Sequence, residues 1–324
     1  MGSFMPFRRF AALAAVALLG AAPAPFKPVE HTAAPAFLDK MSPGEIAYAA
    51  DIGTSIERSR SAKWQLAEHR RLATALARLA PGRKGAVDAF VLSVGLDSDP
   101  VFGREAREAG RVLARRYAAT ARSLTLAGSD GTGPSPLPMG SNANIAAALA
   151  RIAELMGPED VLVLYTTSHG AQFGVVYNDG DAGFGMIGPS KLAALLGELG
   201  IKNRLLLISA CYSGVFVPTL VTDSTAIVTA ASSTRTSFGC QADNDWTFFG
   251  DALVNHALRK PQGLATAAAE ATMTIAEWEA KGRLIPSQPQ SYIGAKASAW
   301  LGVLERALPP ATVPVGKPAL DALK

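Results

Sequence analysis

Two apolar stretches decide the fold of this chain: VLVLYTTSHG at residues 161–170 and LLLISACYSG at residues 205–214. Each begins with a continuous apolar run and ends in small residues and a glycine. Strands that are apolar on both faces are typical of a parallel sheet covered by helices on its two sides. The stretch KLAALLGELG at residues 191–200 lies between them and has a helical period. The sequence therefore predicts a strand, helix, strand unit whose two strands run parallel.

The same alternation extends in both directions along the chain. Strands are predicted at residues 86–95, 121–128 and 225–232, a hairpin around residues 178–180, and helices at residues 104–118, 142–156, 247–259 and 264–280. We therefore expect an α/β fold, with a mainly parallel sheet flanked by helices on both faces.

Length and composition exclude several classes of protein. The chain has 324 residues, of which 49% are hydrophobic and 18% charged, and its formal net charge is +4. These values are typical of a globular protein and exclude disordered and collagen-like chains. The small charge gives no reason to expect a nucleic-acid partner.

Residues 1–24 have the form of a signal peptide. Arg8 and Arg9 precede an apolar run at residues 10–19, and small residues follow it. The run is shorter than the roughly 20 residues that a membrane-spanning helix needs. We therefore expect an exported protein, periplasmic or secreted, with no stable membrane span after signal removal. The alternative is an uncleaved N-terminal anchor.

The rest of the chain divides into three parts by composition. Residues 25–87 are predicted as an Ala- and Pro-rich linker followed by N-terminal helices between about Glu45 and Leu79. Residues 88–306 carry the alternating strands and helices and form the main domain. Residues 307–324, which contain four prolines, are predicted as a flexible tail.

Three chemically active side chains directly follow predicted strands. Asp97, His169 and Cys211 each come just after an apolar run, and the carboxyl ends of parallel strands form the ligand-binding edge of such sheets. A thiolate activated by an imidazole is a nucleophile that attacks carbonyl carbons. Gly170 and Gly214 would let backbone N–H groups approach a developing oxyanion.

The residues alone leave other interpretations open. Cys211 could be a buried hydrophobic residue beside a hydrogen-bonded histidine. It could also form a disulfide with Cys240, because an exported chain with two cysteines allows that pairing. The chain would then be a catalytically inactive binding or scaffold protein. A periplasmic small-molecule binding domain is a further alternative.

Four sequence blocks resemble the legumain-like cysteine peptidases, the asparaginyl endopeptidase family. VLVLYTTSHG and LLLISACYSG resemble the blocks that carry the catalytic His-Gly and Ala-Cys of that family. TAIVTAASSTRTSFGC, at residues 225–240, and FFGD, at residues 248–251, resemble the two blocks that follow. The resemblance covers about half of the chain. It implies a caspase-like fold, a three-layer sandwich, for the domain at residues 88–306.

The resemblance also implies catalytic roles for individual residues. His169 becomes the general base and acid, and Cys211 becomes the nucleophile. The N–H groups of Gly170 and Cys211 would form the oxyanion hole. Asp97 stands where the family usually has an asparagine that orients the histidine, and a carboxylate could do the same work. A turn-forming aspartate in LDSDP is the alternative for Asp97.

Substrate-binding positions differ from those of the family. Tyr212 stands where the family has an acidic residue just after the nucleophile. Thr236, Ser237 and Asp251 match the wall of the pocket for the residue before the scissile bond. Arg104 lies one position from a pocket arginine of the family, and a surface arginine on a helix is the alternative for it. Strict preference for asparagine therefore does not carry over.

Together these observations predict an exported cysteine endopeptidase, or a transpeptidase, that acts on peptide or protein substrates. The reaction would pass through an acyl-thioester on Cys211 and would need no metal and no organic cofactor.

Overall fold

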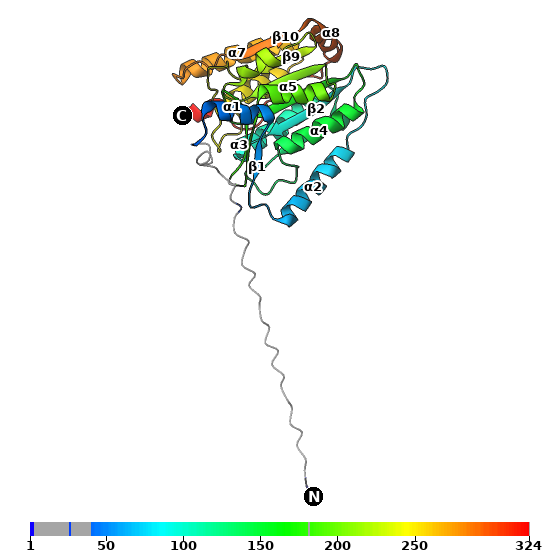
Figure 1. Ribbon diagram of the computed structural model, residues 1–324, viewed down its shortest axis with the longest axis vertical. Helices are drawn as coiled ribbons and strands as arrows, with labels where there is room; N and C mark the ends of the chain where they lie inside the picture. The colour runs from blue at the N-terminus through cyan, green and yellow to red at the C-terminus, as the bar shows by residue number, and fades with distance from the viewer. Residues whose placement is uncertain (3–25, 27–39, 181, 324) are drawn as a thin grey trace.

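The computed structural model describes residues 1, 2, 26, 40–180 and 182–323 (Figure 1). The predicted signal peptide at residues 1–24, apart from its first two residues, lies outside the described residues. No helix in the described part of the chain has the length and apolar character needed to cross a membrane.

A six-stranded sheet forms the centre of the molecule, with strand order β10-β9-β8-β4-β2-β3. All neighbouring strands are parallel except β10 and β9, which are antiparallel. The predicted mainly parallel sheet is therefore confirmed. Its strands are β2 (Ala89–Gly95), β3 (Ser123–Ala127), β4 (Val161–Thr167), β8 (Arg204–Ser209), β9 (Thr225–Thr229) and β10 (Gln290–Ile293).

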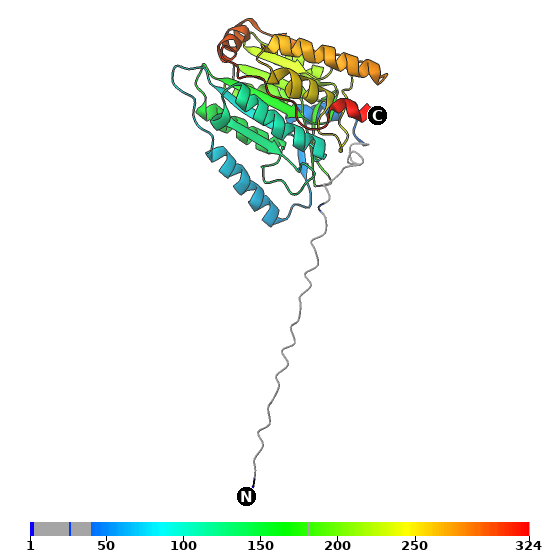
Figure 2. The same cartoon turned by 180° about the vertical axis from the view of Figure 1, so that it is seen from behind.

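Helices cover both faces of this sheet, which gives three layers (Figures 1 and 2). The first face packs against α3 (Pro100–Arg116), α7 (Leu264–Lys281) and α8 (Ala295–Leu304), together with the π-helix η4 (Gly250–His256) and the 3-10 turn η5 (Ala257–Arg259). The second packs against α4 (Asn142–Leu155), α5 (Pro189–Glu198) and α6 (Val217–Leu220).

Alternation along each strand explains why both faces are apolar. In β2, Ala89 and Val91 belong to the core on the first face, and Phe90, Leu92 and Val94 belong to the core on the second. Every residue of β2, β4 and β8 is buried. Successive side chains point to opposite faces of a strand, so a strand covered on both sides must be apolar throughout.

A smaller antiparallel sheet, with strand order β1-β7-β6-β5, lies beyond the carboxyl edge of the main sheet. The predicted hairpin around residues 178–180 is β6 followed by β7. Gly53 adopts φ 70° and ends α1. The helical region predicted between about Glu45 and Leu79 is therefore two helices, α1 and α2, with β1 between them. These elements are α1 (Pro43–Ile52), β1 (Ser55–Glu57), α2 (Ala62–Ala77), β5 (Gly170–Ala171), β6 (Gly174–Asp179) and β7 (Gly183–Ile187).

The last residues differ from the predicted flexible tail. Thr312, Val315 and Ala319 form hydrogen bonds with residues of η4 and η5 on the first face of the sheet. The side chain of Ala319 is buried in the core on that face. We call residues 312–323 the C-terminal arm. It packs because its backbone N–H groups find side-chain acceptors, as Val315 does at Asn255 Oδ1 (2.9 Å). Three short turns complete the fold: η2 (Thr120–Arg122), η3 (Ser213–Phe216) and η6 (Ala319–Leu323).

Candidate active site

Strand register brings three predicted site residues to one edge of the sheet. Gly95 of β2 pairs with Thr167 of β4, and Thr167 pairs with Ser209 of β8. Asp97, His169 and Cys211 each follow two residues after those paired positions. Parallel strands in register end at the same level, so the three side chains start from neighbouring points on one edge.

The loops after β4 and β8 touch at Gly170. A Cβ atom at this position would lie 2.1 Å from the carbonyl oxygen of Cys211 and 3.0 Å from the Cβ of Ala210. No side chain fits there, so only glycine allows this approach. The contact holds the residue after His169 against the backbone of Cys211.

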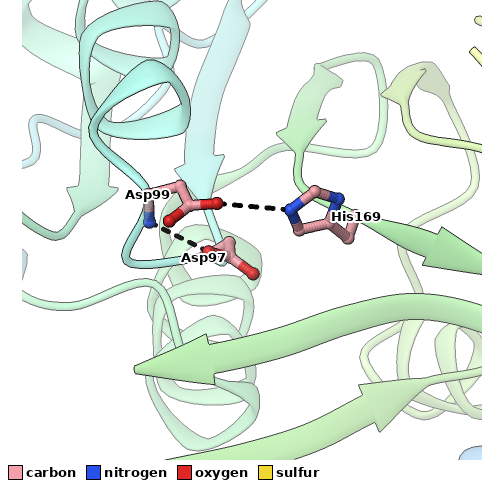
Figure 3. A group of neighbouring side chains, drawn as sticks. All are labelled: Asp97, Asp99 and His169. Atoms are coloured by element: carbon pink, nitrogen blue, oxygen red, sulfur yellow. Dashed lines mark hydrogen bonds and ion pairs between the residues drawn. The ribbon is translucent and has the colours of Figure 1, made fainter. Parts of the chain in front are cut away.

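His169 lies between a carboxylate and an aromatic ring. Its Nε2 atom is 3.4 Å from Oδ2 of Asp99 (Figure 3). Phe102, on the first turn of α3, packs edge-on against the imidazole with ring centroids 5.0 Å apart. About a third of the His169 side chain is exposed, so the ring is fixed on two sides and still open to a substrate.

Asp97 lies beneath this pair and is 3% exposed. Its Oδ1 accepts a hydrogen bond from the backbone N–H of Asp99 at 2.9 Å (Figure 3). One ligand atom from each of Asp97, Asp99 and His169 lies within 4.8 Å of the others. The carboxylate in direct contact with the histidine thus belongs to Asp99, while Asp97 fixes the backbone that carries it.

Burial and charge shift two pKa values at this site. Burial lowers the pKa of His169, but Asp99, the Cys240 thiol and the charge of Asp97 outweigh it and raise that pKa to about 10. Burial raises the pKa of Asp97 to about 7, against the opposing effects of His169 and of the Asp99 N–H group. His169 is therefore an imidazolium at neutral pH.

Cys211 is half-buried and contacts the loop that follows β9. Its Sγ accepts a hydrogen bond from the backbone N–H of Ser237 at 3.3 Å and lies 3.6 Å from Ser237 Oγ. Tyr212 adopts φ 57°, and its N–H donates to the carbonyl of Arg235 at 2.8 Å. The backbone of Tyr212, directly after the cysteine, therefore has a left-handed conformation that is rare for residues other than glycine. Constrained backbone of this kind clusters at functional sites.

Cys240 lies on the same loop as Ser237 and faces the histidine. Both cysteines are free thiols, so the structure contains no Cys211–Cys240 disulfide. The Cys240 thiol helps to raise the pKa of the imidazole. The loop at residues 237–240 thus contacts the cysteine with one residue and the histidine with another.

The predicted substrate-binding residues separate into two groups. The first group lies beside Cys211. Ser237 contacts Cys211 directly, Tyr212 follows Cys211 in the chain, and Thr236 is exposed beside Ser237. Arg104 instead hydrogen-bonds to the backbone carbonyls of Asp130, Ala242 and Asn244, and so connects α3 to neighbouring loops.

Asp251 is fully buried on the first face of the sheet. Its carboxylate accepts hydrogen bonds from Asn255 Nδ2 at 2.8 Å and from the backbone N–H of Ala319 at 2.7 Å. His256 Nε2 lies 3.4 Å from it. The structure thus engages this carboxylate with the C-terminal arm and does not place it with Cys211 and Ser237.

A buried carboxylate that the sequence patterns do not single out supports the strand that precedes Cys211. Glu105, on α3, accepts hydrogen bonds from Tyr165 Oη at 2.5 Å and from the Thr247 N–H at 2.6 Å. The Thr247 hydroxyl lies 3.0 Å from the hydroxyl of Ser209, two residues before Cys211. This network joins α3, β4 and β8 below the site.

Comparison with known proteins identifies the family. The model of the peptidase C13 family matches residues 140–300, which contain His169 and Cys211. No curated protein matches the chain significantly. A solved structure described as "structure of pro-sf-caspase-1" is 14% identical, with a TM-score of 0.38, and the match covers 66% of this chain and 91% of that one. The chain belongs to the peptidase C13 family, the legumain family of cysteine-type peptidases.

Proposed function

We propose that this chain is an exported cysteine endopeptidase, or a transpeptidase, with Cys211 as nucleophile and His169 as its acid and base. One observation carries the assignment of the pair. Register places both residues two positions beyond the paired residues Thr167 and Ser209, and the Gly170 contact holds their loops together.

The charge of His169 fits the first half of such a reaction. The thiolate form of cysteine attacks a peptide carbonyl, and a nearby imidazolium favours it. Sγ of Cys211 forms a bond to the carbonyl carbon, and the tetrahedral intermediate then releases the amine. His169 donates its proton to that leaving amine. The product is an acyl-thioester on Cys211 and a neutral imidazole.

The second half regenerates the enzyme. Water, or the amino group of a second peptide, attacks the thioester carbon while His169 accepts the proton. The carbon–Sγ bond then breaks, and Cys211 leaves as a thiolate beside the imidazolium. Hydrolysis or transpeptidation follows from which of the two nucleophiles reaches the thioester. The N–H groups of Gly170 and Cys211 are the proposed donors to the oxyanion in both halves, since the tight loop contact leaves no side chain between them.

Asp99 is the proposed orienting residue of the histidine. Its carboxylate lies 3.4 Å from Nε2, where it stabilises the imidazolium and fixes the ring, as the carboxylate of a catalytic triad does. Asp97 supports this arrangement through the N–H of Asp99.

Substitution of the two proposed catalytic residues tests the assignment. Cys211→Ala and His169→Ala should each abolish cleavage of a denatured protein substrate, because one lacks the nucleophile and the other the proton carrier. Iodoacetamide should alkylate Cys211 and stop cleavage. His69→Ala, an exposed position on α2, is the matched control and should cleave normally. Cleavage that persists in either catalytic variant would refute the assignment.

Export is proposed from the N-terminal sequence. The basic residues Arg8 and Arg9, the short apolar run and the small residues after it support it. Intact-mass measurement of the chain made in a secreting host should show removal of about 24 residues, as the position of the small residues implies. A full-length chain retained in the cytosol would contradict this proposal and leave the peptidase assignment intact.

A further inference from the structure

Three metal-binding side chains converge beside the sheet edge. Asp97 and Asp99 come from the loop after β2, and His169 comes from the loop after β4 (Figure 3). One ligand atom from each lies within 4.8 Å of the other two. Among the residues that the structure describes, no other group of three or more histidines, cysteines and acidic residues meets that limit.

A buried amide provides a second, independent observation. Asn178, on β6, forms a parallel bridge with Asp97, and residues paired in this way project their side chains to the same face. Asn178 is 4% exposed. Its Oδ1 atom finds no hydrogen-bond donor among the described residues, which is costly for a buried carbonyl oxygen. A cation bound beside Asp97 would satisfy it.

The donor set selects the class of ion. One imidazole nitrogen and two carboxylate oxygens suit Zn²⁺, which binds such atoms at about 2.0–2.2 Å. Three protein ligands leave a fourth position, which water or the Asn178 oxygen can fill. Carboxylates alone would favour Ca²⁺ or Mg²⁺, and the histidine shifts the preference to Zn²⁺.

We propose that Asp97, Asp99 and His169 form a Zn²⁺ site that competes with catalysis. Bound Zn²⁺ would take the Nε2 lone pair of neutral His169, displace the contact with Asp99 and release the ring proton. The ring would then have no free lone pair with which to accept a proton, and loss of its remaining Nδ1 proton would leave an imidazolate, so it could no longer act as the acid and base. Metal binding itself does not depend on the proposed function; only the inhibition does.

Zn²⁺ binding is measured best in a full chain that carries Cys211→Ala and Cys240→Ala, because thiolates also bind this metal. Competition with a chromophoric chelator should show one equivalent of bound Zn²⁺, and binding should raise the melting temperature. His169→Asn and, separately, Asp99→Asn should each weaken binding by at least about tenfold, since even residues that only support metal ligands have effects of that size.

His256→Asn is the matched control. His256 also lies 3.4 Å from a carboxylate, that of Asp251, but it belongs to no three-ligand group in the described part of the chain. It should leave Zn²⁺ affinity unchanged. Equal affinity in His169→Asn, Asp99→Asn and the parent, or no binding by a parent with a native circular dichroism spectrum, would overturn the proposal.

Activity separates this proposal from the peptidase assignment. In the chain with native cysteines, Zn²⁺ should inhibit cleavage, and a chelator should restore it. A chain that binds Zn²⁺ at His169 but cleaves nothing refutes the proposed function and supports the metal site. A chain that cleaves but does not bind Zn²⁺ refutes the metal site alone.

Discussion

His169 owes its charge to three neighbours, two on the loop after β2 and one on a loop distant from it in the chain. Asp99 precedes α3, Asp97 follows β2, and Cys240 lies on the loop after β9. A raised pKa in the folded state means that folding favours the protonated ring. The stability that this ring contributes is fully present below its ordinary pKa of 6.5 and is lost as pH rises through about 10.

Asp99→Asn should lower the pKa of His169 below about 10, because it removes the carboxylate in direct contact with Nε2. Titration of the histidine by NMR measures this shift directly. If the imidazolium supplies the leaving-group proton, the alkaline limb of the activity profile should move to lower pH as well. An unchanged histidine titration would show that Asp99 does not set the charge of the ring.

The sequence predicts the proposed catalytic pair but assigns the orienting role to Asp97, whereas the carboxylate in contact with His169 is that of Asp99. Asp97 and Asp99 both belong to LDSDP, and the family resemblance points to Asp97. Only the course of the loop decides which carboxylate reaches the imidazole. The sequence does contain a feature that could have identified Asp99. This residue directly precedes Pro100, the first residue of α3, and so lies at the end of the loop that forms the site edge.

At the scale of elements, the parallel strands were predictable because burial on both faces leaves an unbroken apolar run. The four-residue strand β10 was missed, since it is mostly exposed and follows a segment with two prolines. The predicted helix at residues 247–259 becomes the π-helix η4 and the 3-10 turn η5. A π-helix bonds residue i to i+5 and a 3-10 helix bonds residue i to i+3. The sequence pattern does not distinguish these short segments from an α-helix.

Gly170→Ala should reduce kcat/KM by about a hundredfold, because a displacement near 1 Å between reacting groups has effects of that size. The added Cβ would lie 2.1 Å from the Cys211 carbonyl oxygen, so the loops after β4 and β8 must separate. Steady-state cleavage kinetics measure the change.

Gly197→Ala provides the comparison for that variant. Gly197 lies in α5, and a Cβ atom added there would meet no heavy atom within 4 Å. It should leave kcat/KM unchanged and raise the free energy of unfolding by about 0.5–1 kcal/mol, the ordinary gain for alanine in a helix. Equal kinetics for the two variants would contradict the importance of the loop contact.

At the scale of the whole molecule, the C-terminal arm joins regions that are distant in sequence. Val315 accepts a hydrogen bond from Trp246 Nε1 at 2.8 Å, and Ala319 donates to Asp251. The arm was predicted as a tail because its prolines and small residues show no period. These hydrogen bonds use backbone N–H and carbonyl groups of the arm. Because every residue except proline carries both groups, no sequence pattern shows where they will find partners.

A chain that ends after residue 311 should be less stable by several kcal/mol, because each buried polar group that loses its partner costs about 1–3 kcal/mol. Asp251, Asn255 and Trp246 would each lose a partner on the arm. Urea-induced unfolding measures the difference. Val313→Ala, at a side chain that is 77% exposed, should have almost no effect. Equal midpoints for truncated and full chains would show that the arm contributes no stability.

The strand order has a consequence for the timing of folding. β2 pairs with β4, although β3 and α4 lie between them in the chain, and β4 then pairs with β8 beyond the hairpin and α5. Such pairings between distant segments close slowly compared with local contacts. β2 can pair with β3 early, but the β4–β8 pairing, which brings the loops of His169 and Cys211 together, needs the chain as far as Ser209. If the chain is exported unfolded, as proposed, this delay would keep it able to pass through a narrow translocation channel before the edge that carries Cys211 and His169 assembles.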